Sequence, residues 1–349
     1  MTRKKIILLF VFSLIAAVAF AQHDSTFYQE YNDKLIISLY NSFVTEDNIA
    51  FSQTIKKDSL GKSPFHYYAD ANVISGIELD YDIFSLALAY KVVPPQNTFQ
   101  KGNSYYSGLG LNLGEDNWKL ETSYKNYKGF YDLNSPNYIH PFTDSTPYYQ
   151  NHSMVVENFK AKFLYVINTK KFSYDAAYSC DARQLKSAFT WIAISNLYYN
   201  HLKTDTSFIP FPIRDFYTGY SNFNGLNVIG FSEGLGFSAT LVLFHRFFGN
   251  ITTAYEPEVQ WRKYSYASIA EPYLCYITSS GDTRISFGYN GKRLFFFISL
   301  IADYSNYNKK QILIKNDFYS GSSTIGYRFG VKKPGFYKKF EKSKIYQWL

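Results

Sequence analysis

The chain lacks any apolar run of about 20 residues, the length that a membrane-spanning helix needs. Its longest apolar stretch, residues 6–20, follows Lys4 and Lys5 and runs into the small-x-small triplet Ala19-Phe20-Ala21. A positive start, a short apolar core and a small-residue cleavage site are typical of a secretory signal peptide. We therefore expect residues 1–21 to be a cleaved signal peptide and residues 22–34 to form a short periplasmic segment.

Cysteine is nearly absent, since Cys180 and Cys275 are the only two in 349 residues. We expect them on non-adjacent strands, and exported proteins that depend on disulfides usually carry more cysteine. No Cys-x-x-Cys pair and no zinc-ligand spacing occurs, so the sequence predicts no metal site and no cofactor. No cysteine follows the expected cleavage site, so a lipidated N-terminus is not expected.

The sequence also lacks the Gly-x-Ser-x-Gly motif of many acyl hydrolases. His152 and Ser153 lie where a strand is expected to leave an outer loop, at a height suited to a lipid-modifying enzyme. Adjacent strand residues point to opposite faces, so these two cannot form a catalytic dyad in a regular strand. The sequence therefore predicts no catalytic residue and keeps a lipid-modifying site at the outer rim as an alternative.

Aromatic residues, in contrast, make up 20% of the chain, with 34 Tyr and 32 Phe against 4 Trp. Tyrosine suits a bilayer interface because its ring has one apolar end and one polar end. The mean hydropathy of −0.24 is too polar for a helical membrane protein. A membrane β-barrel can be this polar because only alternate residues contact lipid.

The positive charge is concentrated at the two ends of the chain. The formal net charge is +8, and residues 1–21 contribute three of these charges through Arg3, Lys4 and Lys5. Residues 331–349 contain six lysines against one glutamate, which accounts for the remaining excess. The rest of the chain is close to neutral, so the sequence predicts no nucleic-acid partner.

Apolar and polar side chains alternate most clearly over residues 84–91, 108–113, 158–167, 172–179 and 251–262. Strand side chains alternate between two faces, so each segment has one apolar and one polar face. The connections between such segments fall into two sizes. Tight turns are expected near residues 80–83, 114–117, 169–171, 247–250 and 290–292, and long loops over residues 94–103, 133–151, 200–222 and 304–320. Short turns at one rim and long loops at the other are typical of an outer-membrane barrel.

We therefore predict an all-β fold, a transmembrane up-and-down antiparallel β-barrel of about twelve strands, with ten to fourteen left open. The barrel is expected to occupy residues 35–330, with both chain ends on the periplasmic side. The expected strands are 35–43, 65–79, 83–92, 104–113, 118–131, 153–167, 172–198, 226–246, 251–264, 267–290, 293–304 and 321–330.

Three segments of this assignment stay open. Residues 44–64 form either an extra strand or a loop. Residues 172–198 and 267–290 exceed a crossing of roughly 9–11 residues, so each is expected to extend above the membrane or to break. Residues 279–282, Ser-Ser-Gly-Asp, have the composition of a break.

The polar faces of these strands are the candidate functional surface. If the expected register holds, the residues that point into the lumen are Lys119, Glu121, Lys125, Lys160, Lys162, Asp175, Asp181, Arg183, Glu256, Glu258, Arg262, Arg284 and Arg328. Mixed charges either brace a barrel interior as ion pairs or line a solute pathway. The function predicted first is a narrow channel or transport-related barrel, with a structural or adhesive barrel that presents aromatic loops as a further alternative.

The partners expected from the sequence are outer-membrane lipid and the barrel assembly machinery. Residues 324–329 resemble the terminal strand that this machinery recognises, and an ordinary final strand is the alternative. Residues 331–349 interleave lysines with Phe336, Tyr337, Phe340 and Trp348. A cationic aromatic segment beside a membrane suits anionic lipid headgroups or the cell wall. The alternatives for this tail are that it closes the barrel from below or is a short disordered extension.

Four short motifs carry a resemblance to a known group of proteins. They are residues 72–81 (NVISGIELDY), 86–91 (LALAYK), 288–296 (GYNGKRLFF) and 326–329 (GYRF). Together they resemble the uncharacterised outer-membrane domain-of-unknown-function proteins of Gram-negative bacteria. The resemblance implies a barrel in the outer membrane of a Gram-negative bacterium. It transfers no functional residue, because that family has no assigned activity.

Overall fold

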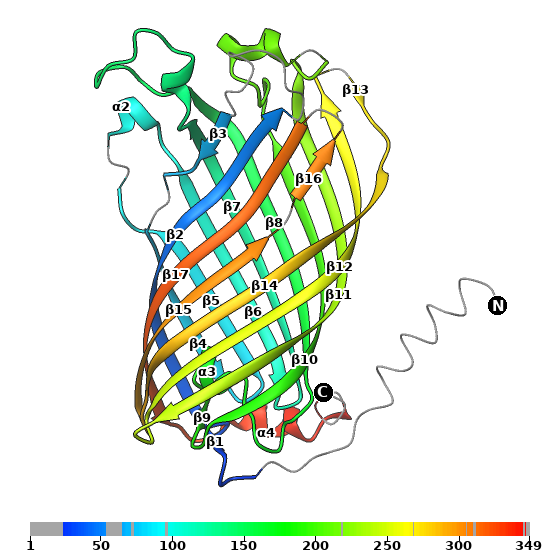
Figure 1. Cartoon of the computed structure of the whole chain (residues 1–349). Coiled ribbons are helices and arrows are strands. Elements are labelled where there is room, and N and C mark those ends of the chain that lie inside the picture. The colour runs from blue at the N-terminus through cyan, green and yellow to red at the C-terminus, as the bar shows by residue number, and fades with distance from the viewer. Residues whose placement is uncertain are drawn as a thin grey trace, which may run out of the picture.

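The computed structural model describes residues 24–53, 65–70, 73–94, 97–217, 219–267, 269–304, 306–309, 312–344 and 346, and they form a closed β-barrel (Figure 1). The expected signal peptide, residues 1–21, lies outside the described residues. Twelve strands build the wall, and each pairs antiparallel with its neighbour in the sequence. They are β2 (Lys34–Gln53), β4 (Val73–Tyr81), β5 (Phe84–Lys91), β6 (Tyr105–Glu115), β7 (Trp118–Asp132), β8 (Gln150–Val166), β10 (Ala188–Lys203), β11 (Phe223–Leu243), β12 (Phe247–Tyr266), β14 (Leu274–Asn290), β15 (Leu294–Tyr304) and β17 (Ile312–Gly330).

The first and last wall strands close the barrel. β17 pairs with β2 from Gly330 opposite Lys34 to Ile312 opposite Gln53. The predicted all-β, up-and-down, twelve-stranded barrel is therefore confirmed. At one end, which we call the turn end, short turns join β4 to β5, β6 to β7, β11 to β12 and β14 to β15. The opposite end, the loop end, carries the long connections (Figure 1).

Short elements complete the fold. β3 (Phe65–Tyr68) bridges β2 and β7 at the loop end, while β13 (Ile269–Ala270) and β16 (Asn306–Lys309) extend hairpins on β12 and β17. β1 (Tyr28–Glu30) and β9 (Ala182–Gln184) form a separate two-stranded sheet. The helical turns are α2 (Thr98–Lys101), η1 (Ser135–Asn137), α3 (Asp175–Tyr178), η2 (Phe211–Phe216) and α4 (Gly335–Glu341). Among the described residues, no helix is long and apolar enough to cross a membrane.

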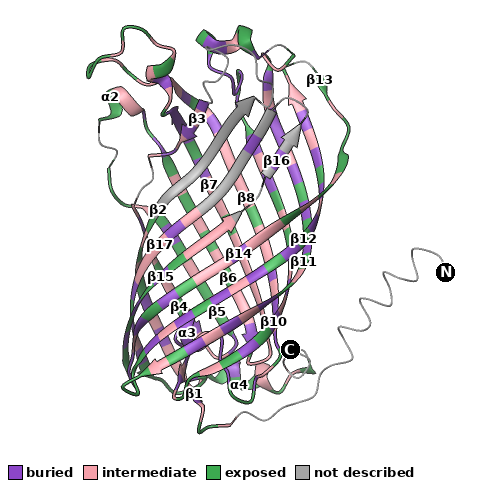
Figure 2. Ribbon diagram, in the orientation of Figure 1, coloured by how far each residue is buried: buried purple, intermediate pink, exposed green. Residues whose placement is uncertain are grey.

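The wall is apolar outside and polar inside. Leu300 on β15 is 54% exposed and Ile277 on β14 is 86% exposed, whereas Gln260 on β12 is 0% exposed and Lys162 on β8 is 3% exposed. Figure 2 shows the alternation of buried and exposed positions along the strands. A protein in water has the reverse arrangement, because unpaired apolar surface favours burial. An apolar outer surface over polar buried faces is the arrangement of a transmembrane barrel.

The structure corrects the predicted strand over residues 172–198. Wall strand β10 begins only at Ala188, and residues 168–187 turn inward, carrying α3 and β9 into the turn end of the barrel (Figure 1). β1 pairs with β9 there, so residues 24–33 join the same unit. We call residues 24–33 and 168–187 the plug. The alternating Phe172, Tyr174 and Tyr178 do not face lipid, because the plug presents them to the inner wall.

Other boundaries also differ from the prediction. β14 runs unbroken through residues 279–282, so the expected break there is wrong. Residues 65–79 form two strands, β3 and β4, rather than one. The turn expected at residues 247–250 lies at residues 244–246, where Phe244 and His245 adopt positive φ angles of 49° and 63°. Residues 44–53 continue β2, and residues 54–64 lie outside the described part of the chain.

The outer face predicts a clear stability effect. We expect Leu300→Arg to lower the free energy of unfolding by about 2–4 kcal/mol, because it places a charge against lipid near the middle of β15. Urea titration of the barrel folded into phospholipid vesicles measures this, with Leu300→Ile as the control. Equal stability of Leu300→Arg and Leu300→Ile would mean that this face does not contact lipid.

Candidate functional site

A cavity of about 390 Å³ occupies the barrel interior, with the plug contributing to its lining at the turn end. Wall strands from β4 to β15 contribute side chains to it, and Asp175 and Asp181 reach it from the plug. Most of its charged side chains occupy inward-facing positions of the wall strands. This cavity is the candidate functional site.

The predicted lumen residues fall into two groups. The cavity lining includes Lys119, Glu121, Lys125, Lys160, Lys162, Asp175, Asp181, Glu256, Glu258 and Arg284. Arg183 lies instead on β9 of the plug, opposite Gln29. Arg262 lies on β12 but does not line the cavity, and its guanidinium stacks 4.2 Å from the Tyr276 ring centroid. Arg328 is buried at the turn end against the plug.

The sequence analysis missed five cavity carboxylates: Glu78, Asp80, Asp82, Asp282 and Asp303. The parity of β4 would have found Glu78 and Asp80, because both alternate with the exposed Ile77 and Leu79. Asp282 was missed because residues 279–282 have the composition of a turn.

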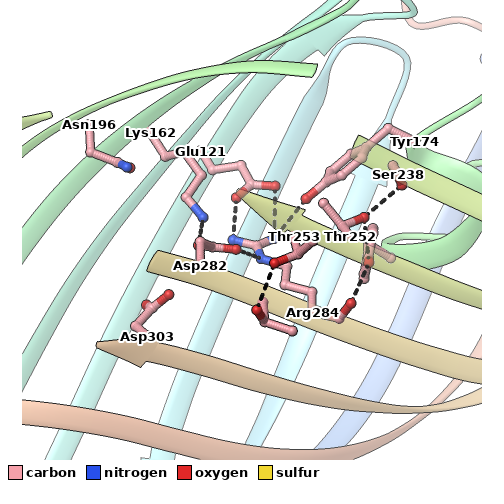
Figure 3. A network of polar contacts seen from close by, with 12 residues as sticks. Glu121, Lys162, Tyr174, Asn196, Ser238, Thr252, Thr253, Asp282, Arg284 and Asp303 are labelled. Atoms are coloured by element: carbon pink, nitrogen blue, oxygen red, sulfur yellow. Dashed lines mark hydrogen bonds and ion pairs between the residues drawn. The ribbon is translucent and has the colours of Figure 1, made fainter. Parts of the chain in front are cut away.

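The centre of the cavity holds an ion-pair network that crosses the lumen (Figure 3). Arg284 on β14 binds Glu121 on β7 through both terminal nitrogens, at 3.2 and 2.8 Å, and its Nη1 lies 3.1 Å from Tyr174 Oη of the plug. Asp282 pairs with Lys162 on β8 and lies 3.6 Å from Arg284 Nε. Bidentate arginine–carboxylate pairs in a low-dielectric interior fix geometry strongly. The network therefore braces β7, β8 and β14 against one another.

A second polar layer involves the carboxylates of β12. Ser232 Oγ donates to Glu256 Oε2 at 2.6 Å, and Asn196 Nδ2 donates to the same oxygen. Tyr198 Oη and Gln260 Nε2 donate to Glu258 Oε1. Hydroxyl and amide donors, rather than cations, stabilise these two glutamates. Their negative charges consequently remain uncompensated by ion pairs within the described residues.

The plug is clamped to the wall by Arg328 and Asn290. The Arg328 guanidinium donates to the Cys180 carbonyl at 3.0 Å, to the Gly291 carbonyl at 2.5 Å and to Asn290 Oδ1 at 2.6 Å. Asn290 Nδ2 then donates to the carbonyls of Ala176 and Ala182 at 3.1 and 3.0 Å. These bonds satisfy plug carbonyls that the short elements α3 and β9 leave open. The clamp therefore fixes the plug to β14 and β17.

A carboxylate of the plug has a perturbed acidity. Burial raises the pKa of Glu30 to about 8, and the neighbouring carboxylates Asp116 and Asp181 act in the same direction. The protonated form of Glu30 is thus the stable one in the folded plug at neutral pH.

The loop end is filled by residues 204–222, which we call the cap and which are described except for residue 218. Phe208 and Ile209 of the cap are fully buried, together with Ile213 and Tyr217. Tyr67 Oη donates to the Phe208 carbonyl at 2.6 Å, and the Phe208 ring lies 5.1 Å from that of Phe223. The cap and surrounding wall residues form one hydrophobic core across the barrel mouth.

The outer-rim pair His152 and Ser153 forms no dyad. Ser153 Oγ lies 3.0 Å from Thr204 Oγ1 and 3.3 Å from Asn151 Oδ1, and it accepts from the Asp205 amide at 3.2 Å. His152 is exposed. The Ser153 hydroxyl is thus held by the start of the cap rather than by a histidine base.

The C-terminal tail docks on the turn end. Tyr337 of α4 and Tyr346 both donate to Asp82 Oδ2 at 2.7 Å, and the Tyr81 and Tyr337 rings lie 5.0 Å apart. Asp82 stands in the β4–β5 turn with φ 54°. Within the described part of the tail, residues 331–344 and 346, α4 thus forms a helical turn beneath β4 and β5 (Figure 1).

We expect Arg328→Met to loosen the plug without opening the wall. Each hydrogen bond to the charged group contributes about 1.5–3 kcal/mol, and its loss leaves buried carbonyls unpaired. Cys180 is a buried free thiol and a direct reporter, once exposed Cys275 is replaced by serine. Maleimide should label Cys180 at least tenfold faster in Arg328→Met, while the exposed Arg293→Met serves as control. Equal labelling rates in both variants would rule out the clamp.

We also expect the plug to loosen as pH rises from about 4.5 to 8. Folded Glu30 keeps its proton over this range whereas the unfolded carboxyl, with a pKa of 4.5, loses it, so rising pH favours opening. The labelling rate of Cys180 relative to a Glu30→Gln variant, measured at each pH, cancels the intrinsic reactivity of the thiol. A ratio that does not change with pH would contradict the assignment.

Comparison with known proteins places the chain in a family. The family described as "Domain of unknown function (DUF4421)" matches residues 22–329. No curated protein matches the chain. Among solved structures, it is similar to the outer membrane protease OmpT from Escherichia coli, with 6% identity over 86% of this chain and 98% of that one and a TM-score of 0.36. It is also similar to the COG4313 outer membrane channel from Pseudomonas putida F1, with 11% identity over 85% and 95% and a TM-score of 0.34. These low scores carry no argument about activity, but the family match covers most of the chain. The predicted resemblance to uncharacterised barrel proteins is confirmed, and the chain belongs to the DUF4421 family.

Proposed function

We propose that this protein is a gated transport barrel for a small polar solute in the outer membrane of a Gram-negative bacterium. The main support is the cavity of about 390 Å³, which is lined by charged side chains. It lies between two structured closures, the plug and the cap. A cavity of this size lies within the range of small-molecule sites. In this proposal the turn end faces the periplasm, the loop end faces outward, and the cavity is the solute compartment of a closed state.

The two closures are held in different ways, which supports separate gating. The plug is held by directional hydrogen bonds from Arg328, Asn290 and Tyr178. Apolar packing of Phe172 and Tyr174 against the inner wall adds to these bonds. The cap is held mainly by aromatic and aliphatic packing. A structural barrel that only presents loops has no need of an internal cavity with charged walls, so transport is the function that the geometry favours.

We also propose the partners that the sequence predicts: outer-membrane lipid, the barrel assembly machinery, and anionic lipid or the cell wall for the C-terminal tail. Lys332, Lys338 and Lys339 are exposed around α4, while Tyr337 is buried against the barrel. A docked helical turn with outward lysines suits anionic lipid headgroups or the cell wall at the periplasmic surface. Recognition of the last strand, β17, by the barrel assembly machinery is part of the same proposal.

Planar-bilayer conductance tests gated transport. The two closures act in series, so wild-type protein should be nearly silent, and removal of either closure alone should give little current. Replacement of residues 170–187 and of residues 206–217 by short Gly-Ser turns, in one chain, should give stepwise conductance. The gel shift between unheated and heated samples confirms that each variant is folded. A folded double variant that stays silent would refute a pathway through this lumen.

A further inference from the structure

The charges that line the cavity do not balance. Ten acidic and five basic side chains line it among the described residues. Four of the basic groups already have acidic partners, in the pairs Lys119–Asp175, Lys160–Asp303, Lys162–Asp282 and Arg284–Glu121. The cavity therefore has more carboxyl groups than its own basic side chains can pair with.

Among the acidic side chains of the cavity, Asp80 most clearly lacks a partner. It is 3% exposed, lines the cavity from β4, and neither of its carboxylate oxygens has a hydrogen-bond donor among the described residues. Glu78 lies two residues before it on the same face and, among the described residues, accepts a hydrogen bond from Ser85 Oγ alone, at 2.9 Å. The charged groups that act most strongly on Asp80 are Glu78, Asp181 and Asp175, which are all acidic. The Ser85 hydroxyl, opposite Asp80 on β5, is the favourable polar group nearby, but it donates its hydrogen bond to Glu78. A buried carboxylate in such surroundings is costly, so it either takes up a proton, as Glu30 does, or binds a cation or a donor.

Most other unmatched groups in the described part of the cavity are also acceptors, although Arg284 Nε, 3.6 Å from Asp282 Oδ1, is an unmatched donor. Glu258 Oε2, Asp181 Oδ1, Asp303 Oδ1 and Asn196 Oδ1 are buried and lack donors within the described residues. A ligand complementary to this lining must bring N–H donors and positive charge, because the wall supplies acceptors in excess. The lining thus selects against anionic solutes.

An organic cation fits the cavity better than a metal ion. No cluster of three or more His, Cys, Asp or Glu in the described residues has the geometry to hold a metal. The volume of about 390 Å³ instead suits a small organic molecule. Ammonium groups are compact and present three donors each, so one can serve both Glu78 and Asp80.

We propose that the cavity binds a small aliphatic amine of the polyamine class, with one ammonium group at Glu78 and Asp80 and a further amine facing Glu258. This inference rests on the proposed function, because it names the class of solute that the transport compartment holds. Binding supplies the positive charge that β4 lacks and the donors that Glu258 Oε2 and Asp80 lack. Glutarate, an anion of similar length, should be excluded.

Retention of labelled spermidine tests the proposal without requiring passage through the closed ends. The protein is refolded from urea into detergent with ¹⁴C-spermidine, passed through a desalting column and counted. Wild-type barrel should retain about one spermidine per chain. Asp80→Asn and Glu78→Gln should each retain at least tenfold less, whereas Glu115→Gln, an exposed carboxylate on the turn end, should match wild type. Unlabelled putrescine added during refolding should reduce the label that wild type retains, and glutarate should not, which gives a second readout independent of any variant.

Two results would overturn the proposal: no retention by wild type, or equal retention by wild type, Asp80→Asn and Glu78→Gln. The gel shift on heating shows which variants are folded, and the wild-type competition decides the case if neither variant folds. The test separates this inference from the transport function. Conductance of the double closure variant without spermidine retention would remove only the solute class, and retention with a silent double variant would remove only transport.

Discussion

Closure of the wall by the pairing of β17 with β2 is the constraint on which the rest of the structure depends. Once closed, every wall strand has both edges paired and one face turned inward. A barrel of about eight strands can fill its interior with wall side chains, whereas one of twelve is wider. The lumen of such a barrel is therefore either filled by residues outside the wall strands or left open. Here the plug and the cap occupy the two ends, and the cavity is the volume that remains between them.

Charge pairs across the lumen are the second consequence of closure. Lys162 and Asp282 lie on strands that are far apart in the sequence, and the wall brings them together with both side chains nearly inaccessible to solvent. Such pairs contribute modestly to net stability because desolvation offsets attraction, but they specify one geometry. The same low-dielectric interior makes the unmatched carboxylates of β4 conspicuous. A polar interior thus braces the barrel and, in the proposed transport function, would also select solutes by charge.

The wall could be predicted from the sequence because each strand's alternation of apolar and polar residues is visible within that segment alone. Alternation at residues 84–91 or 251–262 directly encodes which side chain faces lipid, and inward parity follows from it. The plug could not be predicted, because Phe172, Tyr174 and Tyr178 alternate like a wall strand although they contact the inner wall. Local pattern reports that a face is apolar but not which apolar surface it meets. The partners of Arg284 and Arg328 likewise depend on strand register across the barrel, which no segment encodes by itself.

The plug is covalently tied at three points, since its longer piece continues into β8 and β10 and its shorter piece into β2. A stopper held in this way cannot be ejected into the periplasm like a separate domain. If the barrel opens as proposed, the plug must rearrange in place, and its displaced residues would still share the lumen with the solute. Because the plug stays inside the lumen, it would limit the width of the open pathway. Passage through such a barrel would be restricted to slender molecules moving in single file.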